Sequence, residues 1–359
     1  MKILFYINAI HHGGAERVMV NLAKEISDRG IECILVTSFY DTWEYPLDKK
    51  VQRISLFDEK LNDGFFKKNV KLVSKLRKVI SLEKPDLVLS FMAEPNFRAL
   101  LASIGLKNKT IISVRNDPEK EYPSFLFRCL AKSLYLLADG VVFQTKDAQA
   151  WFSKKIREKS TIIYNPIESV FYNSVYKGNR KNIVTTGRLT EQKNHKLLID
   201  AFHKIAEKVD DNLYIYGEGE LRGQLEHQIN ELNLTDRCFL PGATHNIPQA
   251  INSARLFVLS SDYEGMPNSL MEAMAMQIPC ISTDCPSGGP RELMGTEGEK
   301  YLVPVGNAAG LSKLMLEVLT SENETMRNIR VMEQQAECFE TNCIIERWYR
   351  YFVEIMMEE

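Results

Sequence analysis

Residues 256–275 read LFVLSSDYEGMPNSLMEAMA, and this stretch decides the fold prediction. The first residues form a short apolar run typical of a buried strand, Gly265 and Pro267 predict a loop, and the remainder has apolar residues at helical spacing. We expect a strand, a loop and a helix that begins near Asn268. A strand whose loop leads directly into a helix is the repeating unit of a parallel sheet, where ligands bind beyond the carboxyl ends of the strands.

The same alternation of strands and helices recurs through most of the chain. The apolar runs form two series, first KILFYI, IECILVTS, PDLVLSF, TIISV and DGVVFQT, then NIVTTGRL, NLYIYGEG, RLFVLSS and PCISTD. Between the two series the rhythm stops, and Pro166 with the polar residues after it predicts a connector. A chain of 359 residues can bury two separate cores. We therefore expect two Rossmann-like α/β domains with parallel sheets, residues 1–165 and residues 166–340.

Composition and charge are those of a globular protein. Apolar residues make up 45% and charged residues 26%, and no run approaches the roughly 18 apolar residues that a membrane span needs. The amino-terminal run is too short for a signal peptide, so we expect a cytoplasmic protein. No cysteine or histidine spacing suggests a disulfide framework or a metal site. Residues 1–165 carry 27 Lys and Arg against 19 Asp and Glu, which predicts either an anionic partner for this half or scattered solvated charge.

A glycine pair, Gly13 and Gly14, follows the first predicted strand and precedes a helix expected from about Gly14 to Arg29. Paired glycines let an anionic ligand approach the backbone amides at a helix start. The simpler interpretation is a strand-to-helix turn that needs a positive φ. Both interpretations stay open on the sequence.

Two cations flank the first strand-to-helix loop of the second domain. Arg188 lies directly after the strand NIVTTG, and Lys193 precedes the apolar helix that follows. Two cations beside helix starts suit a leaving diphosphate, because negative charge builds up on the bridging oxygen as the glycosidic bond breaks. Each alone is more often a surface cation, but the spacing G-R-L-x-x-x-K-N is more specific than either residue.

Two carboxylates, Glu264 and Glu272, lie on the strand-loop-helix unit quoted first. We expect Glu264 in the turn and Glu272 about one turn inside the helix, so that both face a ligand at the helix start. Carboxylate oxygens accept hydrogen bonds from the hydroxyl groups of a sugar or a ribose. The alternative for Glu272 is an ordinary solvated position on a helix.

Together these motifs resemble those of glycosyltransferase family four, which has the GT-B fold. The resemblance spans nearly the whole chain and rests on Gly13-Gly14, on G-R-L-x-x-x-K-N, on the turn Gly217-Glu218-Gly219 and on the block E-G-x-P-x-x-x-x-E that starts at Glu264. It implies two Rossmann-like domains facing across a cleft, the first binding the acceptor and the second the nucleotide-sugar donor. Residues 341–359 resemble the closing helix that in this family crosses back to the first domain.

The resemblance assigns roles to single residues. Arg188 and Lys193 would hold the donor diphosphate, and Glu264 would orient the donor sugar, which makes these three the predicted catalytic residues. Glu272 would accept hydrogen bonds from the ribose, and the Ser269 and Leu270 amides would complete a phosphate cradle. The predicted donor-binding residues are Gly13, Gly14, Arg188, Lys193, Glu264, Gly265, Met266, Pro267, Asn268, Ser269, Leu270 and Glu272.

The resemblance also implies the chemistry. Members of the family retain the configuration of the transferred sugar, need no metal, and are interpreted as using front-face attack in which the leaving phosphate helps to deprotonate the acceptor. We expect a hexose or N-acetylhexosamine donor, as a UDP-sugar, and a glycan or polyprenyl-diphosphate-linked acceptor in the synthesis of a surface polysaccharide.

One position departs from the family pattern. Many relatives have a histidine after the strand equivalent to TIISV, whereas this chain has Arg115 followed by Asn116. An arginine is no general base near neutral pH, so Arg115 and Asn116 are candidates for contact with the acceptor or the donor sugar. The alternative is that Arg115 pairs with Asp117 or Glu119.

A basic amphipathic helix is predicted over residues 64–80. Lysines surround apolar residues at roughly helical spacing, namely Phe66, Val70, Val73, Leu76 and Ile80. An apolar stripe on a crossover helix usually packs on the sheet, which leaves the excess of lysine unexplained. With Arg128 and Lys132 of a later helical segment, it suggests peripheral docking on anionic lipid at the inner face of the membrane.

Other functions fit the sequence less well. A nicotinamide oxidoreductase would need G-x-G-x-x-G and an acidic residue after the second strand, and the chain has neither. Nucleic-acid binding lacks a basic stripe interleaved with aromatic residues. A GT-B-fold sugar-nucleotide epimerase and a non-catalytic sugar-nucleotide-binding subunit remain as alternatives to the transferase.

Overall fold

The computed structural model describes residues 1–11, 13–244 and 246–357. The chain divides into two compact units, one formed by Met1–Pro166 with Asn342–Glu359 and the other by Ile167–Thr341. The division falls one residue after the boundary expected from the sequence. The first unit is therefore discontinuous, and it includes the last helix of the chain.

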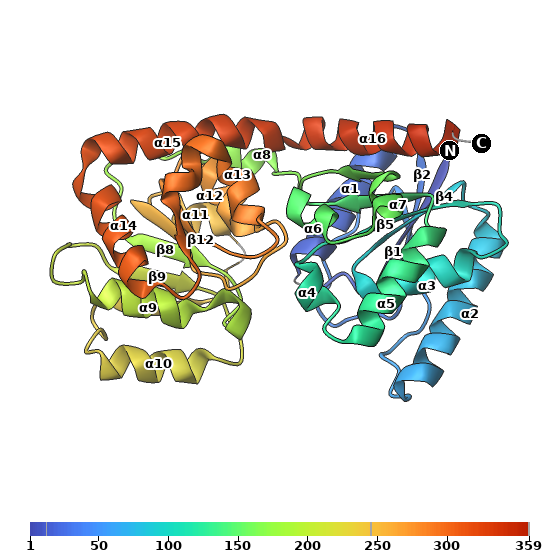
Figure 1. Ribbon diagram of the computed structural model, residues 1–359, viewed down its shortest axis with the longest axis horizontal. Coiled ribbons are helices and arrows are strands. Elements are labelled where there is room, and N and C mark those ends of the chain that lie inside the picture. Colours follow the sequence, from blue (N-terminus) through green and yellow to red (C-terminus); the bar gives the residue numbers. More distant parts are fainter. Residues whose placement is uncertain (12, 245, 358–359) are drawn as a thin grey trace. The chain divides into compact units, whose positions relative to one another are not determined.

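In the described part of the first unit, seven parallel strands form one sheet in the order β3-β2-β1-β4-β5-β6-β7 (Figure 1). The strands are β1 (Lys2–Ile7), β2 (Glu32–Thr37), β3 (Val51–Ser55), β4 (Leu87–Phe91), β5 (Lys109–Ser113), β6 (Gly140–Phe143) and β7 (Ser160–Ile162). The helical segments are α1 (Gly14–Asp28), α2 (Phe65–Glu83), α3 (Ala93–Ser103), α4 (Pro118–Glu121), α5 (Phe125–Leu134), η1 (Tyr135–Leu137), α6 (Lys146–Ala150), α7 (Lys154–Arg157) and α16 (Thr341–Met357).

Both faces of this sheet are covered, which explains why its strands are continuous apolar runs. Along β1, Ile3, Phe5 and Ile7 belong to a core shared with α1 and α16, whereas Leu4 and Tyr6 belong to a core shared with α2. Successive side chains of a strand point to opposite faces, so an alternating sequence would have left one face in water.

In the described part of the second unit, six parallel strands form one sheet in the order β10-β9-β8-β11-β12-β13. The strands are β8 (Ile183–Thr186), β9 (Leu213–Tyr216), β10 (Cys238–Gly242), β11 (Leu256–Leu259), β12 (Cys280–Asp284) and β13 (Leu302–Pro304). The helical segments are α8 (Ser169–Tyr172), η2 (Glu191–Lys193), α9 (His195–His203), α10 (Arg222–Glu231), α11 (Ile247–Ile251), α12 (Asn268–Ala275), α13 (Gly289–Gly298), η3 (Glu299–Tyr301), α14 (Ala308–Thr320), α15 (Glu322–Ala336) and η4 (Glu337–Phe339).

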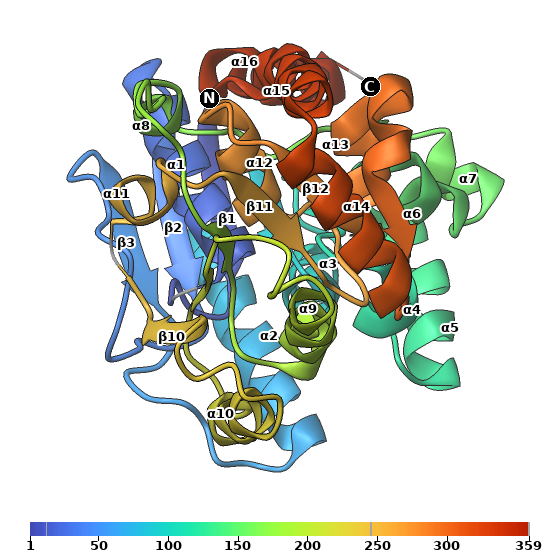
Figure 2. The same cartoon turned by 90° about the vertical axis from the view of Figure 1, so that its left-hand side faces the viewer.

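Strand β11 lies next to β8 although two strands, β9 and β10, separate them in sequence. Figure 2 labels β11 and its other neighbour in the sheet, β12. Parallel neighbours end at the same edge of a sheet, so the loops that follow β8 and β11 meet there. This adjacency brings Arg188 and Lys193 of one loop to Glu264 of the other.

The last helix, α16, packs on the first unit. Trp348 is fully buried, with its ring 5.9 Å from that of Phe91 at the end of β4. The Tyr351 hydroxyl accepts a hydrogen bond from the Val141 amide at 3.0 Å and donates to the Lys159 carbonyl at 2.9 Å. The helix therefore completes the core of a unit whose other residues lie far earlier in the chain.

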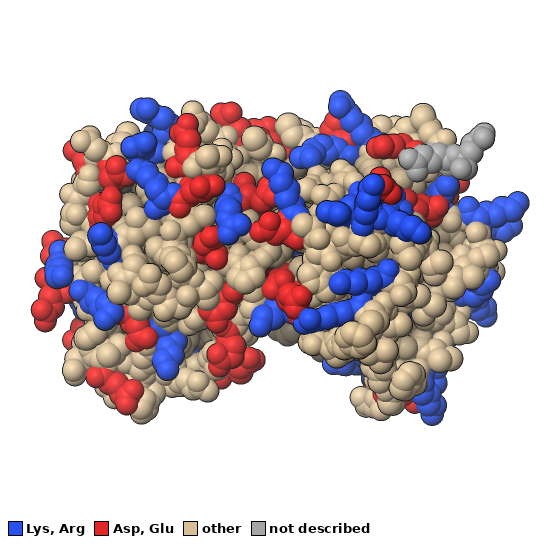
Figure 3. Space-filling model, in the orientation of Figure 1, with Lys and Arg blue, Asp and Glu red and all other residues tan. Residues whose placement is uncertain are grey.

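Helix α2 packs differently from the expected stripe. Its buried residues are Leu72, Leu76 and Ile80, whereas Phe66 and Val70 are 82% and 69% exposed. A helix advances about 100° per residue, so Phe66 and Val70 lie about a quarter to a third of a turn from a face centred on Leu76. The expectation that they belong to the packed stripe was wrong. Basic side chains gather on this unit around α5 and along the edge where α2 lies (Figure 3).

Among the described residues, no helix combines the length and the apolar composition needed to cross a bilayer.

Candidate functional site

The strand-loop-helix prediction for residues 256–275 is confirmed, with β11 ending at Leu259 and α12 beginning at Asn268. Glu264 lies in the loop between them and is 6% exposed. Its Oε1 accepts hydrogen bonds from the Lys193 ammonium at 2.5 Å and from the Ser261 hydroxyl at 2.7 Å. Two predicted catalytic residues, from different loops, are thus in direct contact.

Further hydrogen bonds join the same two loops. The Asp262 amide donates to the Gln192 carbonyl at 2.9 Å, and the Gln192 side chain donates to the Tyr263 carbonyl at 3.0 Å. Asn194 adopts a left-handed conformation with φ 43°, and its amide group donates to Asp262 at 2.7 Å. Its side-chain oxygen also caps α9, so the asparagine of the K-N motif both starts a helix and connects the loops.

The ion pair between Lys193 and Glu264 is largely removed from water, with side chains 15% and 8% exposed. In a buried ion pair each charge compensates the other. Removal of one partner leaves the other charge buried and unpaired, which typically costs 3–5 kcal/mol. The Lys193 charge is therefore balanced within the protein, and an anionic ligand would have to share the ammonium with Glu264.

Arg188 is exposed, and no hydrogen bond or ion pair holds its guanidinium within the described residues. Its carbonyl accepts hydrogen bonds from the Thr190 amide at 3.0 Å and from His195 Nε2 at 3.2 Å. The backbone of Arg188 is thus fixed while its five N–H donors remain available to a ligand.

The turn Gly217–Gly219 lies directly against the Arg188 loop. A Cβ at Gly217 would lie 1.8 Å from the Gly187 carbonyl oxygen, and one at Gly219 would lie 2.4 Å from the Leu189 carbonyl oxygen. Only residues without a side chain fit at these two positions. The glycines of this motif therefore serve close packing between two loops.

Glu272 lies in the second turn of α12 and is only 5% exposed. The alternative of a solvated surface glutamate is therefore wrong. A buried carboxylate at this position needs polar partners, because burial of an unpaired charge is costly.

Ser269 and Leu270, whose amides were predicted to cradle a phosphate, lie in the first turn of α12. The Leu270 amide donates to the Pro267 carbonyl at 3.2 Å, so this N–H is already engaged within the helix. The Ser269 hydroxyl is buried and has no hydrogen-bond partner in the described part of the chain. An unpaired polar atom at a helix start is consistent with a ligand site.

Other predicted donor residues form the loop itself. Gly265, Met266 and Pro267 are buried, and Asn268 is half-buried as the first residue of α12. A Cβ at Gly289 would lie 1.9 Å from the Gly265 carbonyl oxygen, so the start of α13 closes against this loop. The backbone here has little freedom to move.

The glycine pair of the first unit lies at the start of α1, as expected, but Gly13 does not adopt a positive φ. Gly13 precedes α1 with φ −108° and ψ 156°, and Gly14 is the first residue of the helix. The interpretation as a turn with positive φ is therefore wrong for Gly13. A Cβ at Gly13 would lie 1.9 Å from Oε2 of Glu16, which is 7% exposed. The helix start thus holds a carboxylate of the chain itself.

Arg115 is buried, and its contacts differ from the alternative of an ion pair with Asp117 or Glu119. Its guanidinium donates to the Asn165 side chain and stacks over the Phe91 ring, with Cζ 4.2 Å from the ring centroid. The expected pairing with Asp117 or Glu119 is wrong. Asp117 instead caps α4 by accepting from the Glu119 amide at 3.1 Å. Burial lowers the pKa of Arg115 to about 9, so the group stays charged at neutral pH.

The Glu121 carboxylate holds the backbone of both Arg115 and Asn116. Both amides donate to Oε2 of Glu121, at 3.2 Å from Asn116 and 3.4 Å from Arg115. Burial raises the pKa of Glu121 to about 7, although these hydrogen bonds act in the opposite direction. Arg115 Nε and Glu121 Oε1 have no hydrogen-bond partner in the described residues, which leaves two polar atoms of these side chains unsatisfied.

Sequence reasoning missed Ser261, Gln192 and His195. Ser261 and Gln192 both contact Glu264, the latter at 3.4 Å, and His195 contacts the Arg188 backbone. All three could have been found from their positions in the sequence. Ser261 lies three residues before Glu264, Gln192 lies within the G-R-L-x-x-x-K-N motif, and His195 directly follows that motif.

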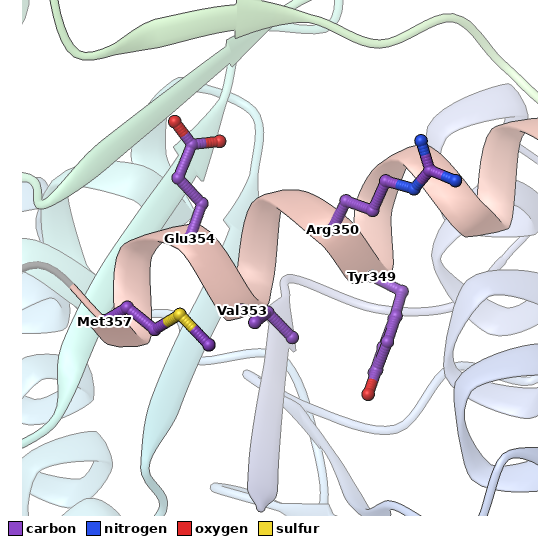
Figure 4. A pocket seen from close by; sticks show the side chains of 5 residues that line it. All are labelled: Tyr349, Arg350, Val353, Glu354 and Met357. Atoms are coloured by element: carbon purple, nitrogen blue, oxygen red, sulfur yellow. The ribbon is translucent and has the colours of Figure 1, made fainter.

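A surface groove lies elsewhere, along α16 (Figure 4). Its lining residues are Tyr349, Arg350, Val353, Glu354 and Met357, none of which the sequence singled out. Within residues 1–11, 13–244 and 246–357, no group of three or more His, Cys, Asp or Glu side chains could hold a metal ion.

Comparison with known proteins identifies the family of the chain. Residues 168–335 match the family model "Glycosyl transferases group 1", and residues 12–170 match "Glycosyltransferase Family 4". An uncharacterized glycosyltransferase of Methanocaldococcus jannaschii is 32% identical over 291 residues, which are 72% of this chain and 70% of the relative. The N-acetylgalactosamine-N,N'-diacetylbacillosaminyl-diphospho-undecaprenol 4-alpha-N-acetylgalactosaminyltransferase of Campylobacter jejuni is 30% identical over 323 residues, 85% of this chain and 87% of the relative.

Solved structures share the fold at lower identity. Anabaena HepE in complex with UDP and glucose has a TM-score of 0.82 and 19% identity, over 99% of this chain and 100% of the other. Sucrose-phosphate synthase of Thermosynechococcus elongatus has a TM-score of 0.85 and 15% identity over the full length of both.

Two parallel-sheet α/β units with charged loops at the ends of adjacent strands define the GT-B class of fold. Within that class, the chain belongs to glycosyltransferase family 4, with the group 1 domain as its second half, and it is a hexosyltransferase.

Proposed function

We propose that this protein is a retaining transferase that moves a hexose or N-acetylhexosamine from a UDP-sugar to a polyprenyl-diphosphate-linked saccharide during surface polysaccharide synthesis. The Campylobacter jejuni relative is named for an undecaprenol-linked acceptor and an α-linked product, and the fold neighbour HepE was crystallised with UDP. Transfer from an α-linked sugar nucleotide to give an α-linked product is retention. The residues of the described site need no metal ion for the roles below.

The observation that carries this proposal is the pairing of the two loops through Lys193 and Glu264, together with an exposed Arg188 guanidinium, on one of these loops, that has no partner among the described residues. Arg188 and Lys193 stabilise the charge on the departing diphosphate. Glu264, fixed by three side-chain donors, accepts hydrogen bonds from the donor sugar, and Glu272 accepts them from the ribose. The leaving phosphate takes the acceptor proton, so no separate base is assigned.

Donor specificity is tested first by thermal shift with UDP-, GDP- and dTDP-sugars, because a ligand that binds the folded chain raises its melting temperature. Release of UDP is then measured with and without an undecaprenyl-diphosphate-linked saccharide. We expect release that depends on the acceptor and an α-linked product from an α-linked donor. Rearranged sugar nucleotide without acceptor would instead indicate an epimerase, and binding without turnover would indicate a non-catalytic subunit.

We also propose that the first unit docks on an anionic bilayer through an apolar surface at the ends of two helices. This surface consists of Phe65, Phe66 and Val70 of α2 with Phe125, Leu126 and Leu130 of α5. Phe66 and Phe125 are 82% and 83% exposed, and contiguous exposed apolar residues mark interaction surfaces. The Phe65 ring lies 6.0 Å from that of Phe127, so the two helix ends form one surface.

The charges around this surface favour a lipid partner. Helix α2 carries six cations and a single acid, Glu83, at its far end. Lys67 and Lys71 share Asp63, at 3.2 and 2.5 Å, which leaves a net positive rim beside the exposed aromatic rings. Apolar residues that insert among acyl chains and lysines at headgroup level are the two features of a peripheral membrane surface.

Flotation with liposomes tests this docking. We expect the wild-type chain to float with vesicles of phosphatidylcholine and phosphatidylglycerol but not with phosphatidylcholine alone. Phe66→Ser with Phe125→Ser should abolish flotation, whereas Leu82→Ser, an exposed leucine at the other end of α2, should not change it. A double variant that floats like the wild type would contradict the proposed surface.

A further inference from the structure

A buried histidine lies beneath the Arg188 loop. His195 is the first residue of α9 and is 3% exposed. Its Nε2 lies 3.2 Å from the Arg188 carbonyl oxygen, while Nδ1 is buried without a hydrogen-bond partner in the described residues. None of the roles proposed above uses this side chain.

The surroundings select one protonation state of His195. Burial, together with the nearby charge of Lys193, lowers the pKa of the imidazole to about 4. At neutral pH the ring therefore carries one proton. A carbonyl oxygen can only accept, so the contact with Arg188 requires that proton on Nε2. The ring donates a hydrogen bond without adding a second positive charge beside Lys193.

The two neighbours of Arg188 in sequence are held by the end of β9 and the turn after it. The Gly187 amide donates to the Tyr216 carbonyl at 2.9 Å, and the Leu189 amide donates to the Glu218 carbonyl at 2.9 Å. The only side chain that holds Arg188 itself, within the described residues, is that of His195. A guanidinium on a flexible side chain depends on its backbone for direction.

We infer that His195 is a positioning residue, whose neutral Nε2–H fixes the Arg188 backbone so that the guanidinium meets the diphosphate of the donor. This inference rests on the role of Arg188 in the proposed function. His195 acts through Arg188 and does not touch the substrate.

Binding of UDP, measured by titration calorimetry, tests the inference without knowledge of the acceptor. His195→Phe keeps a buried ring but removes the donor, and His195→Gln can restore an N–H at the position of Nε2. We expect His195→Phe to weaken UDP binding about five- to tenfold, as for the loss of one hydrogen bond, and His195→Gln to regain most of it. His203→Gln, at an exposed histidine of the same helix, should leave the affinity unchanged.

The same substitution in an Arg188→Ala variant distinguishes an effect through Arg188 from a general loss of stability. In Arg188→Ala, the His195→Phe substitution should cause no further loss of UDP affinity, because residues that act through one another are not additive. Equal losses in both backgrounds, or a loss that His195→Gln leaves uncorrected, would overturn the inference. If Arg188→Ala itself has no effect on UDP binding, the role of Arg188 in the proposed function fails first, and this inference fails with it.

Discussion

The guanidinium of Arg188 is the exposed cation of the candidate site, so its removal should change chemistry more than folding. We expect Arg188→Ala to lower turnover about a hundredfold, because one lost electrostatic contact to a developing charge typically costs ~3 kcal/mol. Lys196→Ala is the matched control, since Lys196 is an exposed cation on the adjoining helix α9. Rates of UDP release are compared at saturating donor. A variant with wild-type turnover would remove Arg188 from the leaving-group role.

Lys193 should have a structural effect that Arg188 lacks. Lys193→Ala leaves the Glu264 carboxylate buried beside Ser261 without its cation, and we expect a loss of roughly 3–5 kcal/mol in the free energy of unfolding. Addition of Glu264→Gln removes the unpaired charge and should recover part of that loss. Urea denaturation of the single and double variants measures both effects. Additive destabilisation by the two substitutions would show that the pair is not coupled.

Glu121 should make stability depend on pH. Its pKa is about 7 in the folded chain against an ordinary value of 4.5, because burial disfavours the charged form. Below pH 4.5 both folded and unfolded chains hold the proton, and between pH 4.5 and 7 only the folded chain does. The contribution of Glu121 to the free energy of unfolding is therefore largest below pH 4.5, and it is lost as the pH rises through 7. Thermal melts should show Glu121→Gln more stable than wild type at pH 8 and equal to it near pH 4.5, and a constant difference across this range would contradict the assignment.

At the scale of elements, the turn after β9 should tolerate no side chain at Gly217. A Cβ there would lie 1.8 Å from the Gly187 carbonyl oxygen, which is backbone and cannot rotate away. We expect Gly217→Ala to destabilise the chain by at least ~2 kcal/mol and to weaken UDP binding through the Arg188 loop. Gly223→Ala, in α10 with no atom within 4 Å of the added Cβ, should be neutral or stabilising by about 0.5–1 kcal/mol. Thermal melts and calorimetry with UDP test both.

The order of strands, loops and helices could be predicted from the sequence because each boundary carries its own signal. The start of α12 at Asn268 follows from the Gly and Pro before it. The contact between Lys193 and Glu264 could not be predicted as firmly, because it depends on the order of strands in the sheet. Strands β8 and β11 are neighbours there, although β9 and β10 lie between them in sequence. The exposure of Phe66 was missed because spacing alone does not say which side of an amphipathic helix the sheet covers.

The site residues differ in the same way. Glu264 and Lys193 could be chosen from their motifs because those motifs mark the ends of strands. The burial of Arg115 and its stacking on Phe91 could not be predicted, since the partner Asn165 lies fifty residues further along the chain. For Gly13, the space where a Cβ would lie is taken by the Glu16 carboxylate, and no local backbone rule predicts this contact.

For the whole molecule, the stability of the first unit should depend on the last helix of the chain. Trp348 of α16 is fully buried against Phe91, and we expect Trp348→Ala to cost about 3–5 kcal/mol. Arg350→Ala, on the exposed face of the same helix, should change stability by less than about 0.5 kcal/mol. Denaturation followed by hydrogen exchange would locate the loss in the first unit, and a loss confined to the second unit would contradict the packing described.

The discontinuity of the first unit also has a consequence for biosynthesis. A ribosome releases β1 to β7 early, but the tryptophan and its neighbours that fill the remaining core emerge only after every strand of the second unit has been translated. Until α16 is synthesised, the nascent amino-terminal half therefore has part of its apolar core exposed. The second unit is continuous in sequence, so all its residues are available once it has left the exit tunnel. Synthesis of α16, rather than domain-by-domain maturation, is the event that lets the earlier half reach its final stability.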